Sequence, residues 1–134
     1  MSTNVKNHYK TANLEKALAQ LQAFCATPHP TQIEIAGIIQ AFEFTFEQFW
    51  KAIKHFAENQ GYLSNSPRSA LKQGLKLEYF SDEKTWLKML EDRNETSHVY
   101  HEQLAHEIYE RIVTRYLPEF LKAAEKLRQS ATVP

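Results

Sequence analysis

The sequence is 134 residues long, a length typical of one domain built around one hydrophobic core. Lysine plus arginine and aspartate plus glutamate number 16 each, so the formal net charge is zero. This balance excludes a protein that holds nucleic acid through a strongly basic surface, and it confines any such role to a local site. Cys25 is the single cysteine, which excludes an internal disulfide and a zinc site made of several cysteines.

The scarcity of turn-forming residues predicts an all-α protein, because only three glycines and five prolines occur. The first ten residues are polar, unlike a signal peptide, and no apolar run approaches the roughly 20 residues that span a bilayer. We therefore expect a cytoplasmic protein without a membrane segment. We expect one domain over residues 1–134, with a helical core at about 13–129.

Two long helices are predicted in the first half of the chain, from apolar residues that recur every three or four positions. The first covers about residues 13–26. The second begins with Thr31 as N-cap and Glu34 three residues later, which together form a capping box, and it ends at Gly61. Its apolar stripe follows strict steps of four and three: Ile35, Ile39, Phe42, Phe46, Phe49, Ile53 and Phe56.

Three further helices are predicted in the second half. One begins at Ser66-Pro67, where the serine caps the helix and the proline occupies its first turn. The next is capped by Ser81-Asp82 and runs into Arg93, and the last spans about residues 102–129 with a kink at Pro118. Short connections between these helices predict an antiparallel, up-and-down bundle of four to five helices. The predicted buried face of the last helix consists of Ala105, Tyr109, Ile112, Tyr116, Phe120, Ala124 and Leu127.

A guanidinium, an imidazole and a phenol occur close together in Arg93, His98 and Tyr100. Arginine binds phosphate bidentately and histidine moves protons near neutral pH, so the group suits chemistry on a phosphodiester. On an unbroken helix, the five residues from Arg93 to His98 would place these two side chains about 140° apart. They converge only if the helix ends within residues 94–97, which are rich in capping and turn residues. The alternative is a surface arginine at one helix end followed by a histidine at the start of the next helix.

The second predicted helix carries further candidate residues. Glu47 and Lys51 are four residues apart, which favours a helical ion pair of about 0.3 kcal/mol on a solvated face. Trp50 and Phe44 lie off the main apolar stripe. Either this helix is buried on two sides, partly against another subunit, or the two aromatic residues mark an exposed interaction patch.

A metal site is not expected. His98, His101, Glu102 and His106 include pairs four residues apart, but the H-E-x-x-H pattern of zinc proteases is absent. The chain also lacks a glycine-rich loop and a paired aspartate motif, so we do not expect it to be a nucleotidyltransferase itself. Cys25 lies on an apolar stripe and is interpreted as a filler of the core.

Several separate segments together resemble one known family. Arg93-x4-His98-x-Tyr100 resembles the R-x4-H-x-Y form of the HEPN-domain motif. Residues 42–51, FEFTFEQFWK, resemble the F-E-x-T-F-E-x-x-W-K segment of the HEPN branch called nucleotidyltransferase substrate-binding proteins. The likeness covers about residues 32–120. Other segments that agree in the same order are Gly61, Ser66-Pro67-Arg68 and the stretch from Trp86 to Asn94.

The resemblance implies a helical bundle that forms a homodimer, with the motif lining a cleft at or near the dimer interface. It also implies a separate minimal nucleotidyltransferase as the partner. Under one interpretation, the HEPN chain is the ribonuclease toxin of a toxin–antitoxin pair, and the nucleotidyltransferase silences it by transferring AMP to Tyr100. Under the other, the chain is a non-catalytic subunit that binds a substrate or a nucleotide for a two-component nucleotidyltransferase.

The toxin interpretation assigns roles to particular residues. Arg93 and His98 would be catalytic in the cleavage of RNA, and the resemblance implies that neither a metal nor another cofactor is required. Asp92, Asn94, Glu47, Lys51 and Trp50 would support the site or bind its substrate.

Overall fold

The structure, a computed structural model, describes residues 3–96 and 101–132, and every element in this part of the chain is helical. None of these helices is long and apolar enough to cross a membrane. The elements in the first two thirds of the chain are α1 (Thr3–Cys25), α2 (Gln32–Asn59), α3 (Pro67–Lys76) and α4 (Glu83–Thr96). The last long segment consists of α5 (Glu102–Arg111), the π-helical turn η1 (Ile112–Tyr116) and α6 (Leu117–Thr132).

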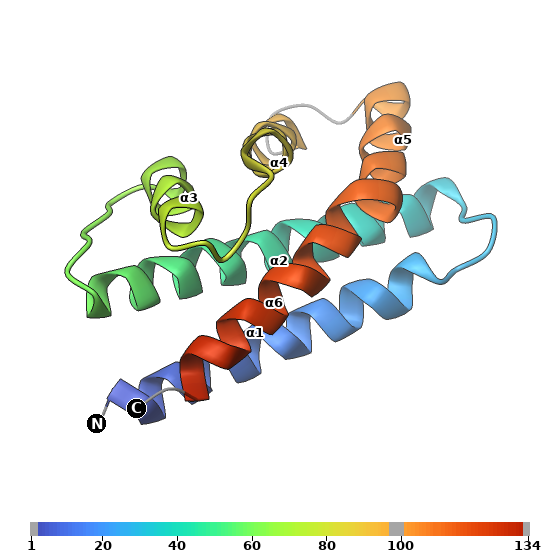
Figure 1. Ribbon diagram of the computed structural model, residues 1–134. Helices are drawn as coiled ribbons and strands as arrows, with labels where there is room; N and C mark the ends of the chain where they lie inside the picture. The colour runs from blue at the N-terminus through green and yellow to red at the C-terminus, as the bar shows by residue number, and fades with distance from the viewer. Residues whose placement is uncertain (1–2, 97–100, 133–134) are drawn as a thin grey trace.

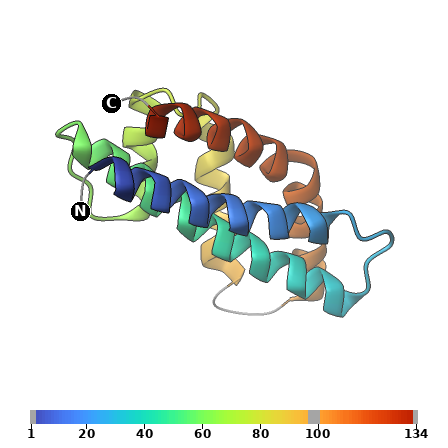
Figure 2. The ribbon, with the colours of Figure 1, turned by 90° about the horizontal axis from the view of Figure 1, so that it is seen from below.

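The three longest helices run side by side. Helix α1 lies along both α2 and α6 and runs in the opposite direction to each of them, so α1 begins at the end of the molecule where α6 finishes (Figures 1 and 2). Helices α3, α4 and α5 contact α2, and α3 and α4 are seen almost end-on in Figure 1 because they cross it. The prediction of an all-α antiparallel bundle is confirmed, with α3 and α4 lying across the long helices.

Helix α2 has the boundaries and the buried face that its sequence predicts. The backbone N–H of Glu34 donates to Thr31 Oγ1 at 3.1 Å, and the N–H of Thr31 donates to Glu34 Oε1 at 2.9 Å, which confirms the capping box. At the other end Gly61 has a φ of 88°, and the N–H of Tyr62 donates to Ala57 O at 2.9 Å, as in a Schellman motif. All seven residues of the predicted stripe are buried.

Helix α1 begins about ten residues earlier than its apolar pattern predicts. The additional turns pack against the end of α2 through polar contacts: Asn7 is buried, and its Oδ1 lies 2.7 Å from His55 Nε2 and 3.2 Å from Asn59 Nδ2. Further along, Thr45 Oγ1 donates to Ala17 O at 3.3 Å. An apolar stripe does not reveal contacts of this kind, so the sequence prediction stops too soon.

Aromatic rings make up the centre of the core and join α2 to α4, η1 and α6. Phe42 stacks on Tyr116 with ring centroids 5.3 Å apart, and Phe49 stacks on Phe120 at 4.7 Å. Trp86 of α4 meets Phe49 edge-on at 5.5 Å. These buried rings fix where α4 and η1 lie relative to α2, and this relation positions the candidate site.

The last long segment differs from the predicted kinked helix in two respects. The irregularity is a π-helical turn that precedes Pro118, closed by a bond from Leu117 N–H to Ile112 O. A wider turn relieves the clash that a proline ring makes with the carbonyl four residues before it. Tyr109, predicted on the buried face, is only half-buried, and Ile108 is buried in its place. The other six residues of that face are buried as predicted.

Candidate functional site

The helix break predicted within residues 94–97 stays a prediction, because residues 94–96 are still helical and residue 97 lies outside the described residues. Arg93 lies in the last turn of α4, which ends at Thr96, and α5 begins at Glu102. His98 and Tyr100 fall in residues 97–100 and therefore lie outside the described residues. The convergence of Arg93 with His98, and the access of a partner enzyme to Tyr100, stay predictions.

The guanidinium of Arg93 is held by a glutamate of α2. Its Nη2 donates to Glu47 Oε1, and its Nη1 donates to Asn94 Oδ1 at 3.2 Å. The side chain is 32% exposed. The contacts with described residues thus use two of the five N–H donors of the guanidinium. An arginine fixed along one edge and still in contact with solvent is suited to binding phosphate.

Glu47 connects Arg93 to a second cation. Lys51 Nζ lies 3.8 Å from Glu47 Oε2, so the two carboxylate oxygens face different basic groups. The predicted ion pair between Glu47 and Lys51 is therefore present. Four of the predicted site residues, Arg93, Asn94, Glu47 and Lys51, are brought together around one carboxylate.

The two aromatic residues that lie off the stripe of α2 have different environments. Trp50 is half-buried against the core, and its indole Nε1 is buried without a hydrogen-bond partner in the described part of the chain. Phe44 is 48% exposed. Trp50 does not join the cluster around Glu47, and it lines a groove on the α1 side of Lys51 instead.

Asp92, the neighbour of Arg93, faces the interior and is 1% exposed. Its carboxylate accepts two hydrogen bonds from Arg111, from Nε at 2.7 Å and from Nη2 at 2.8 Å, and a third from the Tyr116 hydroxyl at 2.5 Å. Buried carboxylates require partners of this kind. Asp92 therefore joins the last turn of α4 to α5 and η1.

The partners of Asp92 were not predicted from the sequence as a network. Arg111 and Tyr116 are five residues apart, which on a regular α-helix would place them about 140° from each other. The π-helical turn, whose hydrogen bonds join residues five apart, brings both side chains toward Asp92. Burial and the hydrogen bond to Asp92 raise the pKa of the Tyr116 hydroxyl, so it remains a protonated donor. The bond to Asp92 also raises the pKa of Arg111.

A second carboxylate of α2 lies near the end of α4. Burial raises the pKa of Glu43, while a hydrogen bond with Thr96 and the charge of Arg93 act in the opposite direction. Thr96 Oγ1 in turn donates to Arg93 O at 2.9 Å. Glu43, Thr96 and His101 line a cavity of about 110 Å³ between α2, α4 and α5.

Two of the residues that sequence spacing offered as metal ligands, His101 and His106, have other contacts. His101 caps α5, because its Nδ1 accepts from Leu104 N–H at 3.4 Å. His106 Nε2 lies 3.6 Å from Glu110 Oε1. Among the described residues, no three histidine, cysteine, aspartate or glutamate side chains are grouped to hold a metal ion, and His98 lies outside them.

A wide groove beside α4 does not contain Arg93. It measures about 1150 Å³ and is lined on α4 by Lys88, Glu91, Asn94 and Glu95. Its charges are mixed and partly paired, as in the 3.2 Å contact between Lys88 Nζ and Glu91 Oε1. The cluster around Glu47 therefore remains the candidate site on chemical grounds, because it presents the arginine of the motif.

The fold is that of a HEPN-like helical bundle. The sequence matches the family model described as "Nucleotidyltransferase substrate binding protein like" over residues 9–129, so the chain belongs to that family. A crystal structure of a protein from Thermus thermophilus is 32% identical, covers 90% of this chain and 99% of that chain, and superposes with a TM-score of 0.74.

A second solved structure shows the same fold at greater sequence distance. It is a chain of the toxin–antitoxin MntA-HpeT in a mutant form, 16% identical, with a TM-score of 0.75 and coverage of 92% of this chain and 97% of that one. At this identity the likeness shows the fold alone. No curated protein matches the chain.

Proposed function

We propose that this chain is the HEPN partner of a separate minimal nucleotidyltransferase, and that it is a metal-independent endoribonuclease toxin. The observation that carries the proposal is the presentation of Arg93 at the end of α4, fixed along one edge by Glu47 and partly exposed. Membership of the family and the shared fold with a toxin–antitoxin chain support the same class of protein. Arg93, His98 and Tyr100 all match the motif.

The proposed reaction is an internal transfer within RNA. The ribose 2′-OH attacks the adjacent phosphorus, the bond to the 5′-oxygen breaks, and the products are a 2′,3′-cyclic phosphate and a 5′-OH end. His98 acts as general acid or base, a role worth roughly 10²- to 10⁴-fold in rate. Arg93 stabilises the charge that develops on the phosphoryl oxygens. Single-stranded or loop RNA is the expected substrate, because its 2′-OH groups and bases are accessible.

Silencing is proposed to act through Tyr100, two residues from His98. The nucleotidyltransferase would attach AMP to the phenolic oxygen, with pyrophosphate leaving from ATP. The added phosphodiester would place a negative charge and a bulky group beside Arg93, where they would compete with the RNA phosphate. The proposal includes a homodimer with the site at or near its interface.

Cleavage of single-stranded RNA by the purified chain in the presence of EDTA tests the nuclease assignment. The wild type should cleave, and His98→Ala should lose activity by about 100-fold or more. His106→Ala is the matched control, because that histidine is exposed and its contacts, with Glu110 and the ring of Tyr109, lie within its own helix. Equal cleavage by wild type and His98→Ala would overturn the assignment.

Incubation with the partner nucleotidyltransferase and ATP tests the silencing step. Mass spectrometry should show the chain gaining mass in steps of one AMP, together with loss of RNA cleavage. Tyr100→Phe should prevent both effects, whereas Tyr62→Phe, which alters a partly exposed tyrosine outside the candidate site, should leave them intact. AMP transfer to Tyr100→Phe at the wild-type rate would disprove this acceptor.

The alternative function is a non-catalytic subunit that binds a substrate or nucleotide for the nucleotidyltransferase. The family description favours it, and an arginine fixed by Glu47 also suits plain phosphate binding. Under this alternative, the purified chain binds a nucleotide and cleaves no RNA. Under the nuclease proposal, it cleaves RNA without the partner.

A further inference from the structure

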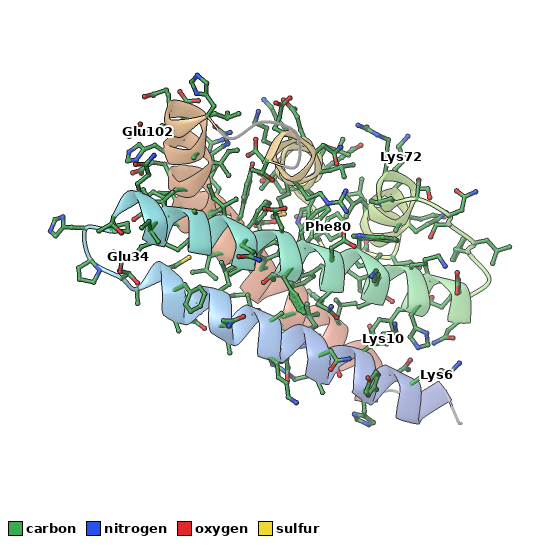
Figure 3. All side chains as sticks on the ribbon, turned by 180° about the vertical axis from the view of Figure 1, so that it is seen from behind. Lys6, Lys10, Glu34, Lys72, Phe80 and Glu102 are labelled. Carbon is green, nitrogen blue, oxygen red and sulfur yellow. The ribbon has the colours of Figure 1, made fainter. Side chains whose placement is uncertain are left out.

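A groove between α1 and α2 gathers basic and aromatic side chains away from Arg93. It has a volume of about 590 Å³. Figure 3 labels two of its lysines, Lys6 and Lys10, which lie one turn apart near the start of α1. The complete lining is Lys6, Tyr9, Lys10, Trp50, Lys51, Lys54, His55 and Glu58.

The groove is locally positive although the chain as a whole is neutral. Lys54 Nζ pairs with Glu58 Oε1 at 3.0 Å, and Lys51 pairs with Glu47. The other two lysines of the lining, Lys6 and Lys10, have no carboxylate within ion-pair distance in the described part of the chain. The four lysines, counted together with their partners Glu47 and Glu58, therefore leave a local charge of +2. Burial and the charges of these two α1 lysines lower the pKa of His55, as expected in a positive field.

Two aromatic side chains accompany these cations. Tyr9 is 64% exposed, and Trp50 is half-buried in the wall of the groove. Bases of single-stranded nucleic acid stack on exposed aromatic rings, while neighbouring cations follow the phosphates. This combination differs from the large mixed-charge groove beside α4, where cations and carboxylates alternate.

The groove is also connected to the candidate site. Lys51, in its lining, contacts one oxygen of Glu47, and Arg93 contacts the other oxygen. The residues of α2 that line the groove extend from Trp50 to Glu58, a rise of eight residues or about 12 Å along the helix. A strand lying in the groove would therefore lead toward Arg93 along one face of α2.

We propose that the groove between α1 and α2 is a subsite for single-stranded RNA that guides the strand toward Arg93. This inference rests on the proposed function, because it names where the substrate of that site is held. The phosphates contact Lys6 and Lys10, and a base stacks on Tyr9. A local subsite of this kind explains how a chain with zero net charge can hold a polyanion.

The test measures binding of a labelled single-stranded oligouridine by fluorescence anisotropy, in the His98→Ala background so that the RNA stays intact. Lys6→Ala with Lys10→Ala should reduce the slope of log affinity against log salt by about 1.4, since each phosphate contact on a single strand contributes about 0.7. Tyr9→Ala should weaken binding about fivefold or more through lost stacking. Lys122→Ala with Lys126→Ala is the matched control, two exposed lysines four residues apart on α6, and should change neither value.

Cleavage kinetics separate failure of this inference from failure of the nuclease proposal. With His98 present, Lys6→Ala/Lys10→Ala should raise KM and leave kcat within about twofold. If the wild type cleaves RNA and this variant has wild-type KM and salt dependence, the subsite is disproved and the nuclease stands. If the wild type does not cleave but binds oligouridine through these lysines, the nuclease fails and the subsite stands.

Two other outcomes would also overturn the proposal. Equal affinity for duplex and single-stranded RNA would overturn the stacking role of Tyr9. Loss of binding to the nucleotidyltransferase in Lys6→Ala/Lys10→Ala, with normal RNA binding, would show that the groove is a protein interface and would overturn the proposal.

Discussion

Replacing Asp92 by alanine should destabilise the protein by about 3 kcal/mol. The carboxylate accepts bonds at 2.7 and 2.8 Å from Arg111 and at 2.5 Å from Tyr116, and the substitution leaves both donors without it. Breaking a buried ion pair costs about 3–5 kcal/mol. The Arg111 side chain is 21% exposed, so water can partly replace its partner and the lower end of that range applies.

Urea denaturation followed by circular dichroism measures this loss, at one fixed protomer concentration because self-association would stabilise the fold. A loss of 3 kcal/mol corresponds to a decrease in Tm of roughly 10 °C for a chain of this length. Tyr116→Phe removes only one hydrogen bond to a charged group and should cost about 1.5 kcal/mol. Glu91→Ala, on an exposed position of the same helix, should stay within about 0.5 kcal/mol of wild type.

The result that would refute the reasoning is an Asp92→Ala variant as stable as Glu91→Ala. The network of Asp92, Arg111 and Tyr116 would then not hold the end of α4 against η1. A large loss in Asp92→Ala with none in Tyr116→Phe would assign the effect to the ion pairs of Asp92 with Arg111 and Lys88.

Three further changes test the fold and its charges. Gly74→Ala would place a Cβ 2.7 Å from Cε1 of buried Phe80. The resulting overpacking costs about 1–3 kcal/mol, which should exceed the gain of ~1 kcal/mol in helix propensity. The variant should therefore unfold at a lower urea concentration than the wild type. Thr31→Ala should lose about 1 kcal/mol by removing the cap of α2, whereas Thr31→Ser should retain it in the same assay. The raised pKa of Glu43 gives a stabilising contribution that is fully present below its usual value of about 4.5 and is lost as pH rises through its folded-state pKa. Glu43→Gln should flatten this decline in denaturation measured across acidic pH, and an unchanged pH profile would exclude that carboxyl as its source.

The parts of the fold that were predicted from sequence are those encoded by neighbouring residues. Thr31, Glu34 and Gly61 mark the ends of α2 through local hydrogen bonds, and the apolar stripe between them marks its buried face. The start of α1 depends on contacts between Asn7 and residues about 50 positions away, so periodicity could not reveal it.

In the candidate site, too, sequence reasoning predicted a contact between neighbouring residues of one helix but not the contacts between distant residues. The pair of Glu47 with Lys51 was predicted from helical spacing, because both residues lie on one helix. The bond from Arg93 to Glu47 joins residues 46 positions apart, and no local pattern encodes it. The partners of Asp92 depend on a π-helical turn, whose register differs from the α-helical one assumed from the sequence.

The chemistry of the RNA ends tests the central claim most directly. Single-stranded RNA is incubated with the purified chain in EDTA, and the termini of the fragments are identified by mass spectrometry. The proposed mechanism predicts 2′,3′-cyclic phosphate and 5′-OH ends with the wild type and no such fragments with His98→Ala. Fragments with 3′-OH and 5′-phosphate ends, or the same fragments from His98→Ala, would contradict it.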